Sequence, residues 1–418
     1  MDGASGPLTN SGALGEPGDA TSLDLFDKCR QFDRANALRR QGIYPYFLPI
    51  TESLTEEVVI NGRRMLMIGS NNYLGLTHHP EVKAAAMAAV ERYGSGCTGS
   101  RFLNGTLDLH IELEDNLARW TQKEAAITFS TGFQVNLGVL STIAGKNDYI
   151  LCDRENHASI YDGCRLSYAT LRKYRHNDME HLERQLASLP EEAGKLIVTD
   201  GVFSMKGDLV DLPNVVRLAK QYDARIMLDD AHGLGVLGKY GRGTAEHFGL
   251  EDDIDLIVGT FSKSFASLGG FAAGKADVID FVKHMGRALM FSASITPSSA
   301  AAALASLKII EGEPERRQRL WTNVRRMQSA FLEMGYDVAE SESAIIPVPI
   351  GEDLDTFQFW KKLHEAGLFT NPVVSPAVPR GQGLIRTSYM ATHTPAELDR
   401  VIEIFAQIGT EAGLVNVA

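Results

Sequence analysis

The pattern of apolar positions predicts alternating strands and helices through the middle of the chain. Helical stretches separate short apolar runs at residues 125–129, 148–151, 195–199, 226–229 and 254–258. Strands that alternate with helices in this way indicate a mostly parallel sheet with helices on both faces. We therefore expect an α/β fold with this sheet as its central layer.

The flanking segments have other patterns and divide the chain into four regions. Residues 1–20 are rich in Gly, Ser, Pro and Asn, which predicts a flexible leader. Residues 21–79 predict an arm, with one helical stretch from Leu23 to about Gln41 and then a β ribbon. Residues 80–296 hold the central sheet. Residues 297–418 predict a smaller α+β domain that opens with a long amphipathic helix from Pro297 to near Gly335.

Lys263 is the first candidate for chemistry. It follows the apolar run 254–258 within Gly259-Thr260-Phe261-Ser262-Lys263-Ser264. A lysine among small residues at a strand end can form a Schiff base with a carbonyl cofactor, since desolvation favours its neutral amine. Taken alone, such a lysine is more often a surface residue in a Ser-rich turn, so a second element must support the catalytic interpretation.

Asp229 and His232 form that second element. They stand in Ile226-Met227-Leu228-Asp229-Asp230-Ala231-His232, where a buried-looking strand delivers an acid and, three residues later, an imidazole. Ligands bind at the carboxyl edge of an open α/β sheet. Pyridoxal phosphate needs an acid opposite its pyridine nitrogen, which Asp229 would supply. His232 would donate to the phenolic oxygen, although a histidine here can also merely cap a loop.

The two segments together resemble the α-oxoamine synthase family of fold-type I pyridoxal phosphate enzymes. The resemblance rests on Asp-Asp-Ala-His-Gly-Leu-Gly at 229–235 followed by Gly-Thr-Phe-Ser-Lys-Ser at 259–264, and it extends over about residues 61–394. It implies a seven-stranded type of central sheet and a homodimer with sites at the subunit interface. It also implies a decarboxylating condensation of an amino acid with an acyl thioester, with Lys263 as Schiff-base residue and then general base.

The same resemblance implies roles for further residues. Backbone amides at a helix start bind phosphate, so the predicted helix start at Gly132 and Phe133 would hold the cofactor phosphate, with Thr260 and Ser262 nearby; Phe133 is equally typical of a core aromatic. His157 would stack on the pyridine ring and orient the reacting bond. Ser204 would reach the ring or phosphate. On the substrate side, the resemblance implicates Asn72, Tyr73 and Arg386, and a guanidinium at Arg386 would grip the substrate carboxylate by two parallel bonds.

Residues 99–106, Gly-Ser-Arg-Phe-Leu-Asn-Gly-Thr, resemble one bacterial branch of the family. That branch condenses L-serine with palmitoyl-CoA to 3-ketodihydrosphingosine, CoA and CO2, the first step of sphingolipid synthesis. The alternatives are glycine C-acetyltransferase, 8-amino-7-oxononanoate synthase, or a noncatalytic subunit of the same fold. One departure is Val373-Val374-Ser375-Pro376, where some members have an Arg-Pro-Pro run. If that arginine assists loss of the serine carboxylate, another group must serve here, for which Arg386 and Arg380 are the candidates.

Composition narrows the classes of partner. The 418-residue chain has 41 basic and 53 acidic residues, a net charge of -12 that opposes nonspecific binding of nucleic acid. Its apolar runs are shorter than a membrane span, so we expect at most peripheral contact with a membrane, such as the inner membrane. The four cysteines lack the spacing of a zinc site, and no metal is expected. A cytoplasmic location is the simplest expectation.

Overall fold

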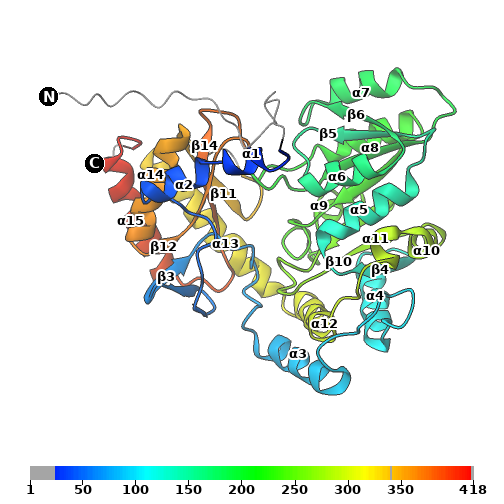
Figure 1. Cartoon of the computed structure of the whole chain (residues 1–418), viewed down its shortest axis with the longest axis horizontal. Coiled ribbons are helices and arrows are strands. Elements are labelled where there is room, and N and C mark those ends of the chain that lie inside the picture. The colour runs from blue at the N-terminus through cyan, green and yellow to red at the C-terminus, as the bar shows by residue number, and fades with distance from the viewer. Residues whose placement is uncertain (1–23, 339–340, 416–418) are drawn as a thin grey trace.

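The computed structural model describes residues 24–338 and 341–415. The predicted leader at residues 1–20 and the predicted helix start at Leu23 lie outside these ranges. The chain folds into two lobes joined by the long helix α13 (Pro314–Met334) (Figure 1). One lobe surrounds a large sheet, and the other holds the smaller C-terminal domain together with the N-terminal arm.

The N-terminal arm differs from the expected single helix. Two short helices, α1 (Asp27–Arg30) and α2 (Arg34–Arg40), replace it, and neither buries any side chain. Isolated helices of this length are marginal because little packing offsets their nucleation cost, so the prediction of one continuous helix is wrong. The predicted β ribbon is confirmed. It belongs to a four-stranded sheet of order β1-β2-β3-β12, with β1 (Glu52–Ser53), β2 (Glu57–Ile60), β3 (Arg63–Met67) and β12 (Leu368–Phe369).

The central sheet has seven strands in the order β4-β10-β9-β8-β7-β5-β6. Strand β10 runs antiparallel to β4 and β9, and the pairs from β9 to β6 are all parallel. The predicted mostly parallel sheet is thereby confirmed. The strands are β4 (Ala125–Phe129), β5 (Tyr149–Asp153), β6 (Thr170–Tyr174), β7 (Lys195–Asp200), β8 (Arg225–Asp229), β9 (Leu256–Thr260) and β10 (Gly270–Gly274).

Helices cover both faces of this sheet because successive side chains of each strand point to opposite faces. Ile150 and Val198 enter one apolar cluster, and their neighbours Leu151 and Ile197 enter another. The first cluster is covered by α5 (Gly132–Ile143), α6 (Ala158–Leu166), α10 (Ala276–Met285) and α11 (Arg287–Met290). The second is covered by α7 (Met179–Ala187), α8 (Leu212–Gln221) and α9 (Thr244–Phe248), which is followed by the 3-10 turn Glu251–Asp253.

The predicted amphipathic helix after Pro297 is interrupted. Helix α12 (Pro297–Gly312) ends before α13 begins at Pro314. Proline lacks the N–H that would continue the ladder of hydrogen bonds, although it fits the first turn of a new helix. The expectation of one helix to near Gly335 is therefore corrected to two, of which the second does end at that glycine.

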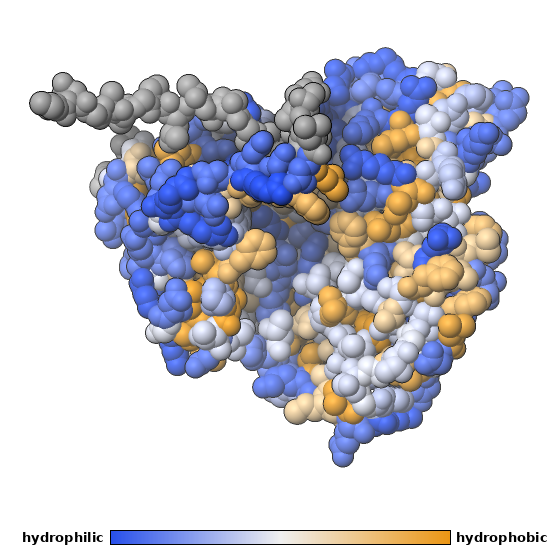
Figure 2. All heavy atoms as spheres, viewed as in Figure 1, coloured by the Kyte–Doolittle hydropathy of each residue, from blue (hydrophilic) through white to orange (hydrophobic). Residues whose placement is uncertain are grey.

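The C-terminal domain has a three-stranded antiparallel sheet of order β11-β14-β13. Its strands are β11 (Ile345–Gly351), β13 (Asn371–Val373) and β14 (Gly383–Ser388), with helices α14 (Asp353–Glu365) and α15 (Pro395–Glu411). Strand β14 carries Arg386, as expected. Figure 2 shows that the surface is hollowed between this domain and the lobe of the large sheet. No helix in the described ranges combines the length and the apolar character needed to span a membrane.

The segment 99–106 is fixed to the core by a buried ion pair. Arg101 binds Glu114 at 2.5 and 3.0 Å, with side chains only 5% and 8% exposed. Glu114 lies on α4 (Asp108–Trp120), which packs with α3 (Pro80–Tyr93) against α12. The Thr128 amide and hydroxyl also donate to Glu114, at 2.8 and 2.7 Å. This carboxylate therefore ties the segment to strand β4.

Replacing Glu114 by Ala is expected to lower the free energy of unfolding by about 3–5 kcal/mol, because Arg101 would stay buried without its counter-charge. Denaturant unfolding followed by circular dichroism measures the change. Glu112→Ala is the control on the same helix, since the Glu112 side chain is 53% exposed in its pair with Lys308 and exposed pairs contribute about 0–1 kcal/mol. Equal effects of the two variants would contradict a structural role for the buried pair.

Candidate active site

A pocket of about 260 Å3 lies at the carboxyl ends of β7, β8 and β9. In an open α/β sheet this edge is the usual place for a ligand. Nine residues predicted for catalysis or cofactor binding all line the pocket: Gly132, Phe133, His157, Ser204, Asp229, His232, Thr260, Ser262 and Lys263. The fold therefore brings together residues that are up to 131 positions apart, from Gly132 to Lys263.

Asp229 is the last residue of β8 and is 7% exposed. Its Oδ2 accepts from the Asn136 amide at 2.6 Å, and its Oδ1 accepts from the Ala231 backbone N–H at 3.2 Å. These bonds hold the carboxylate in place at the pocket wall. Asp230, the next residue, points elsewhere and accepts from the Thr244 amide and hydroxyl, both at 2.6 Å. The sheet alternation thus gives the pair of aspartates different roles.

Lys263 lies in the turn after β9, half-buried in the pocket wall. Burial lowers the pKa of its ammonium to about 8, although the Asp229 carboxylate opposes this change. A pKa of about 8 leaves roughly a tenth of the amine neutral at pH 7, a far larger fraction than for an ordinary lysine. Lys263 is therefore suited to act as a nucleophile toward a carbonyl group.

His232 is held by Tyr73. The Tyr73 hydroxyl lies 2.7 Å from His232 Nδ1 and 3.2 Å from Asn71 Oδ1. Burial, with a further contribution from Lys263, lowers the pKa of His232 well below its ordinary value, so the ring is neutral near pH 7. The hydroxyl has one proton: it donates either to His232 Nδ1, which leaves the proton of the neutral ring on Nε2, or to Asn71 Oδ1, in which case Nδ1–H of His232 donates to the hydroxyl.

His157 belongs to a chain of polar contacts that also reaches Asp229. Its Nδ1 lies 2.7 Å from Ser159 Oγ, and Asn136 donates to the same hydroxyl at 2.8 Å. The His157 backbone N–H donates to Asp200 Oδ2 at 3.0 Å. The pocket wall around Asp229 is therefore a connected network in which Asn136 is the shared donor.

Asn136, Ser159 and Asp200 line the pocket but were not among the predicted site residues. Burial, and then repulsion from Asp229, raises the pKa of Asp200 well above its ordinary value. Asp200 Oδ1 and Asn136 Oδ1 are buried without a hydrogen-bond partner in the described structure. Buried polar atoms are normally satisfied, so these two atoms indicate a site built to receive a polar ligand. For Asp200, the signal in the sequence was an acid directly after the predicted strand 195–199, which has the apolar centre Leu196-Ile197-Val198.

The start of α5 has the features of a phosphate site. A Cβ on Gly132 would lie 2.7 Å from both Cβ and Oγ1 of Thr260, so glycine is needed for the helix start to lie this close to the Thr260 side chain. Thr131 caps the helix by accepting from the Gln134 N–H at 3.1 Å. Helix N-termini favour anions. Together with Lys263 and Asp229, this helix start makes the pocket fit a phosphorylated carbonyl cofactor that carries a basic ring nitrogen.

Arg386 lies beside the pocket, 6% exposed. Its Nε donates to the Ser204 carbonyl at 2.7 Å and its Nη2 to Asn71 Oδ1 at 3.0 Å. The structure does not bring Asn72 to the pocket, because its side chain bonds Thr77 and the Leu76 amide within its own turn. Tyr73 is buried behind His232. On the substrate side of the pocket, the residue that contacts the Arg386 guanidinium is Asn71, whereas the sequence predicted Asn72 and Tyr73.

The departure at residues 373–376 has a simple structural result. Val374 packs in an apolar cluster with Ile43 and Phe357 rather than facing the pocket. Arg380 is exposed, whereas Arg386 is buried next to Ser204. Of the two arginines considered as replacements, Arg386 is therefore the one placed at the site.

The seven-stranded sheet, its smaller C-terminal domain and this pocket define a fold-type I pyridoxal phosphate transferase. The profile of the family "Aminotransferase class I and II" matches residues 63–405. The chain belongs to this family and, within it, to the α-oxoamine synthases, as its relatives show.

These relatives match nearly the whole chain. It is 53% identical to the serine palmitoyltransferase of Sphingobacterium spiritivorum over 93% of this chain and 97% of that protein. A solved serine palmitoyltransferase structure that carries pyridoxal phosphate superposes with a TM-score of 0.91 at 38% identity, covering 94% of this chain and 100% of that one. The 8-amino-7-oxononanoate synthase of Treponema denticola is 40% identical over 91% of this chain and 97% of that protein.

Proposed function

We propose that this protein condenses L-serine with a long-chain acyl-CoA such as palmitoyl-CoA, giving 3-ketodihydrosphingosine, CoA and CO2. The convergence of Lys263, Asp229, His157 and His232 on one pocket carries the proposal. Similarity to a serine palmitoyltransferase at 53% identity, against 40% for an 8-amino-7-oxononanoate synthase, supports serine as the amino acid. In the reaction a bond forms between serine Cα and the thioester carbonyl carbon, the C–S bond breaks, and the serine carboxylate leaves as CO2.

Pyridoxal phosphate is the cofactor, and when bound it supplies an electron sink for the carbanion at the amino-acid Cα. Lys263 would bind its carbonyl carbon, and the start of α5 with Thr260 and Ser262 would hold its phosphate. Asp229 would keep its ring nitrogen protonated, and His232 would donate to its phenolic oxygen. His157, which lines the same pocket as Lys263, would stack on the ring.

The remaining steps belong to side chains that move protons or bind the substrate. Once displaced by the serine amine, Lys263 would take the proton from serine Cα, because a pKa of about 8 keeps enough of its amine neutral. Arg386 would bind the serine carboxylate through Nη1 and the second N–H of Nη2, the edge of the guanidinium that Ser204 and Asn71 do not use. Fixing the carboxylate and the amine at two points orients the Cα bonds for reaction.

The proposed substrate is tested by visible absorbance titration of the purified holoprotein with L-serine, glycine and L-alanine, followed by product analysis with palmitoyl-CoA. Saturable binding that prefers L-serine, together with a 3-keto amino alcohol product, is expected. A preference for glycine or L-alanine with a shorter thioester would instead favour another α-oxoamine synthase activity. A protein that binds no pyridoxal phosphate would contradict the enzymatic proposal altogether.

Arg386→Lys is expected to weaken L-serine binding about 10- to 100-fold, because charge-assisted hydrogen bonds contribute about 1.5–3 kcal/mol and lysine lacks the planar fork. Ethanolamine, which is L-serine without its carboxylate, is the matched ligand and should bind as before. Absorbance titration with both amines measures the ratio of their affinities. An unchanged ratio would contradict the role of Arg386 as carboxylate clamp.

We also propose a homodimer with its sites at the subunit interface. Exposed apolar side chains support this proposal, since Phe102 is 49%, Leu103 77% and Phe291 76% exposed. Phe102 and Leu103 lie in the segment that Arg101 and Glu114 fix to the core, and Phe291 follows α11. Rigid apolar groups of this kind are typical of surfaces that a partner subunit covers.

A further inference from the structure

The loop of residues 203–208, hereafter the bridging loop, connects the proposed substrate clamp to a separate charged cluster. Ser204 lines the pocket, and its carbonyl accepts from Arg386 Nε at 2.7 Å. Arg386 Nη2 is held by Asn71 at 3.0 Å. Because a guanidinium is planar, these two contacts fix its orientation. The position of the Ser204 carbonyl therefore decides which way the guanidinium fork faces.

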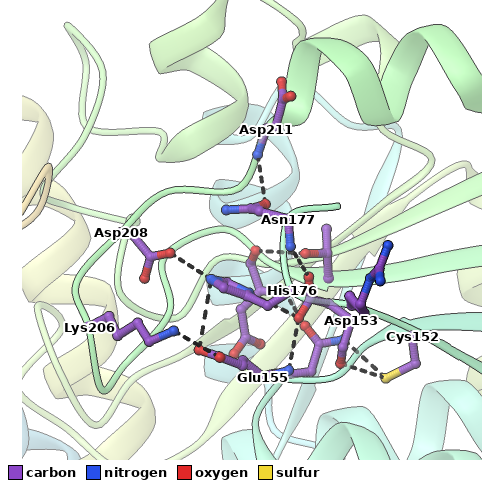
Figure 3. A network of polar contacts seen from close by, with 12 residues as sticks. Cys152, Asp153, Glu155, His176, Asn177, Lys206, Asp208 and Asp211 are labelled. Atoms are coloured by element: carbon purple, nitrogen blue, oxygen red, sulfur yellow. Dashed lines mark hydrogen bonds and ion pairs between the residues drawn. The ribbon is translucent and has the colours of Figure 1, made fainter. Parts of the chain in front are cut away.

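His176 anchors the opposite end of the bridging loop. Its Nε2 lies 2.7 Å from Asp208 Oδ2, and its Nδ1 lies 3.1 Å from Oδ1 of Asp153, the last residue of β5 (Figure 3). The imidazole is 14% exposed, and its centroid is 4.4 Å from that of Phe203, which begins the loop. The Phe203 N–H donates to the Asp208 carbonyl at 3.0 Å and closes the loop. One histidine thus contacts both ends of the loop.

Both ring nitrogens of His176 must donate, since each faces a carboxylate oxygen that only accepts. Burial opposes the charge, but the hydrogen bonds to Asp153 and Asp208 outweigh it and raise the pKa of His176 to about 9. Asp153 is itself fixed by the amides of Glu155 and Asn177, at 2.8 and 2.9 Å. The cluster is therefore a rigid support at the edge of the sheet, on which the loop rests through Asp208.

The middle of the bridging loop contacts the C-terminal domain. Gly207 has a φ of +74°, and a Cβ there would lie 2.6 Å from the Ile345 carbonyl on β11. Met205 packs against the apolar cluster of Val373, Val378 and Leu384. The loop therefore touches the sheet lobe through His176, the C-terminal domain through Gly207 and Met205, and the proposed clamp through Ser204.

We propose that His176 is a positioning residue for substrate recognition: clamped between Asp153 and Asp208, it holds the bridging loop so that the Ser204 carbonyl orients Arg386 toward the amino-acid carboxylate. This inference rests on the function proposed above, because it assigns His176 a role through Arg386. None of the contacts of His176 described here is with a residue of the pocket lining, so its effect should fall on binding of the carboxylate rather than on chemistry at Lys263.

The cluster also predicts a dependence on pH. The charged groups around the ring are Asp153, Glu155 at 3.8 Å from Nε2, and Asp208, with Lys206 pairing Glu155 at 2.8 Å. The folded protein raises the pKa of His176 above its unfolded value, so its stabilising contribution is complete below about pH 6.5 and is lost as pH rises through about 9. The neutral ring can donate to only one carboxylate, so the loop should loosen above that pH.

His176→Gln and Asp208→Asn test the proposal by absorbance titration of the holoprotein with L-serine and ethanolamine near neutral pH. Each variant should weaken L-serine binding about tenfold, which is the loss expected for one charge-assisted hydrogen bond. Ethanolamine binding should change less than about twofold. The wild-type protein should lose its L-serine preference above about pH 9, and His176→Gln should not show this transition. Both amines must displace Lys263, so the titration of Lys263 affects both affinities and cancels in their ratio.

Two controls separate the possible outcomes. His284→Gln changes a half-exposed histidine on α10, paired with Asp280, and should leave both affinities unchanged. Trypsin cleavage after Lys206, in the middle of the bridging loop, should become faster in His176→Gln, which reports loop position without any ligand. Equal weakening of both amines, or no weakening of either, would overturn the proposal. If Arg386→Lys loses the preference for L-serine while His176→Gln and Asp208→Asn keep it, the positioning role of His176 is wrong and the carboxylate clamp stands. If Arg386→Lys also keeps the preference, the role of Arg386 as carboxylate clamp is itself wrong.

Discussion

Lys263→Ala is expected to abolish turnover, lowering kcat by at least about a thousandfold, since general base catalysis alone contributes about 10²–10⁴-fold and the nucleophilic amine is lost as well. The physical reason is the environment of Lys263. Burial lowers the pKa of this lysine to about 8, and Asp229 and His157 share the pocket wall with it. No other lysine lines the pocket among the described residues.

The measurement is the rate of CO2 or CoA release from L-serine and palmitoyl-CoA, with cofactor content checked by absorbance. Small amines such as methylamine should restore part of the activity of Lys263→Ala, because an added base can enter the space of the lost side chain. Lys275→Ala is the control, as Lys275 is exposed at the start of α10. Turnover that survives in Lys263→Ala would rule out this lysine as the catalytic base.

The central sheet followed from the sequence because burial on both faces selects continuous apolar runs. Every residue of β7 and of β9 is buried, so each strand stands out from the polar helical stretches around it.

The two wrong helix predictions lie where a helical pattern continues along the sequence but the structure does not support one continuous helix. Pro314 divides α12 from α13, and the arm around Gln31 lacks the packing that would stabilise one long helix.

The pocket residues that could be predicted carry their chemistry within short motifs. Asp229 with His232, and Lys263 with its small neighbours, lie next to the strands that deliver them to the sheet edge. Asn136 could not be found this way, because its value comes from bonding Asp229 and Ser159, which are distant in sequence. The sequence also predicted Asn72 on the substrate side, where the structure has Asn71. The turn directs the Asn72 side chain to the Leu76 amide and the Asn71 side chain to Arg386, and the sequence does not show which of the two amides faces the arginine.

His176 illustrates the limit of reading from sequence. In the chain it is a histidine between Arg175 and Asn177, with nothing nearby to distinguish it from a surface residue. Its partners Asp153 and Asp208 lie 23 and 32 positions away. Their convergence depends on the parallel pairing of β5 with β6, which sets the ends of both strands side by side. Register, rather than residue type, creates this cluster.

Asp229→Ala is expected to lower kcat about a hundredfold or more, comparable to the loss of about 10²–10³-fold when one group that stabilises developing charge is removed. Asp229 accepts from Asn136 and from the Ala231 N–H, and its remaining lone pairs face the pocket that Lys263 enters. Without this carboxylate a bound pyridine ring would lose the proton on its nitrogen and with it most of its capacity to accept electrons. Steady-state kinetics of the reconstituted variant measure the loss.

Reconstitution with N-methylated pyridoxal phosphate separates this electronic role from a purely structural one. The methyl group gives the ring a permanent positive charge, and the space left by Asp229→Ala can accommodate the methyl group. The analogue should therefore restore part of the kcat that the variant has lost, whereas it should not raise the kcat of the wild-type protein. Asp255→Ala is the matched control, because Asp255 accepts from the Ile226 N–H at 2.8 Å at the opposite end of β8. If the analogue restores nothing, or restores Asp255→Ala equally, then Asp229 supports the fold of the pocket rather than the charge of the ring.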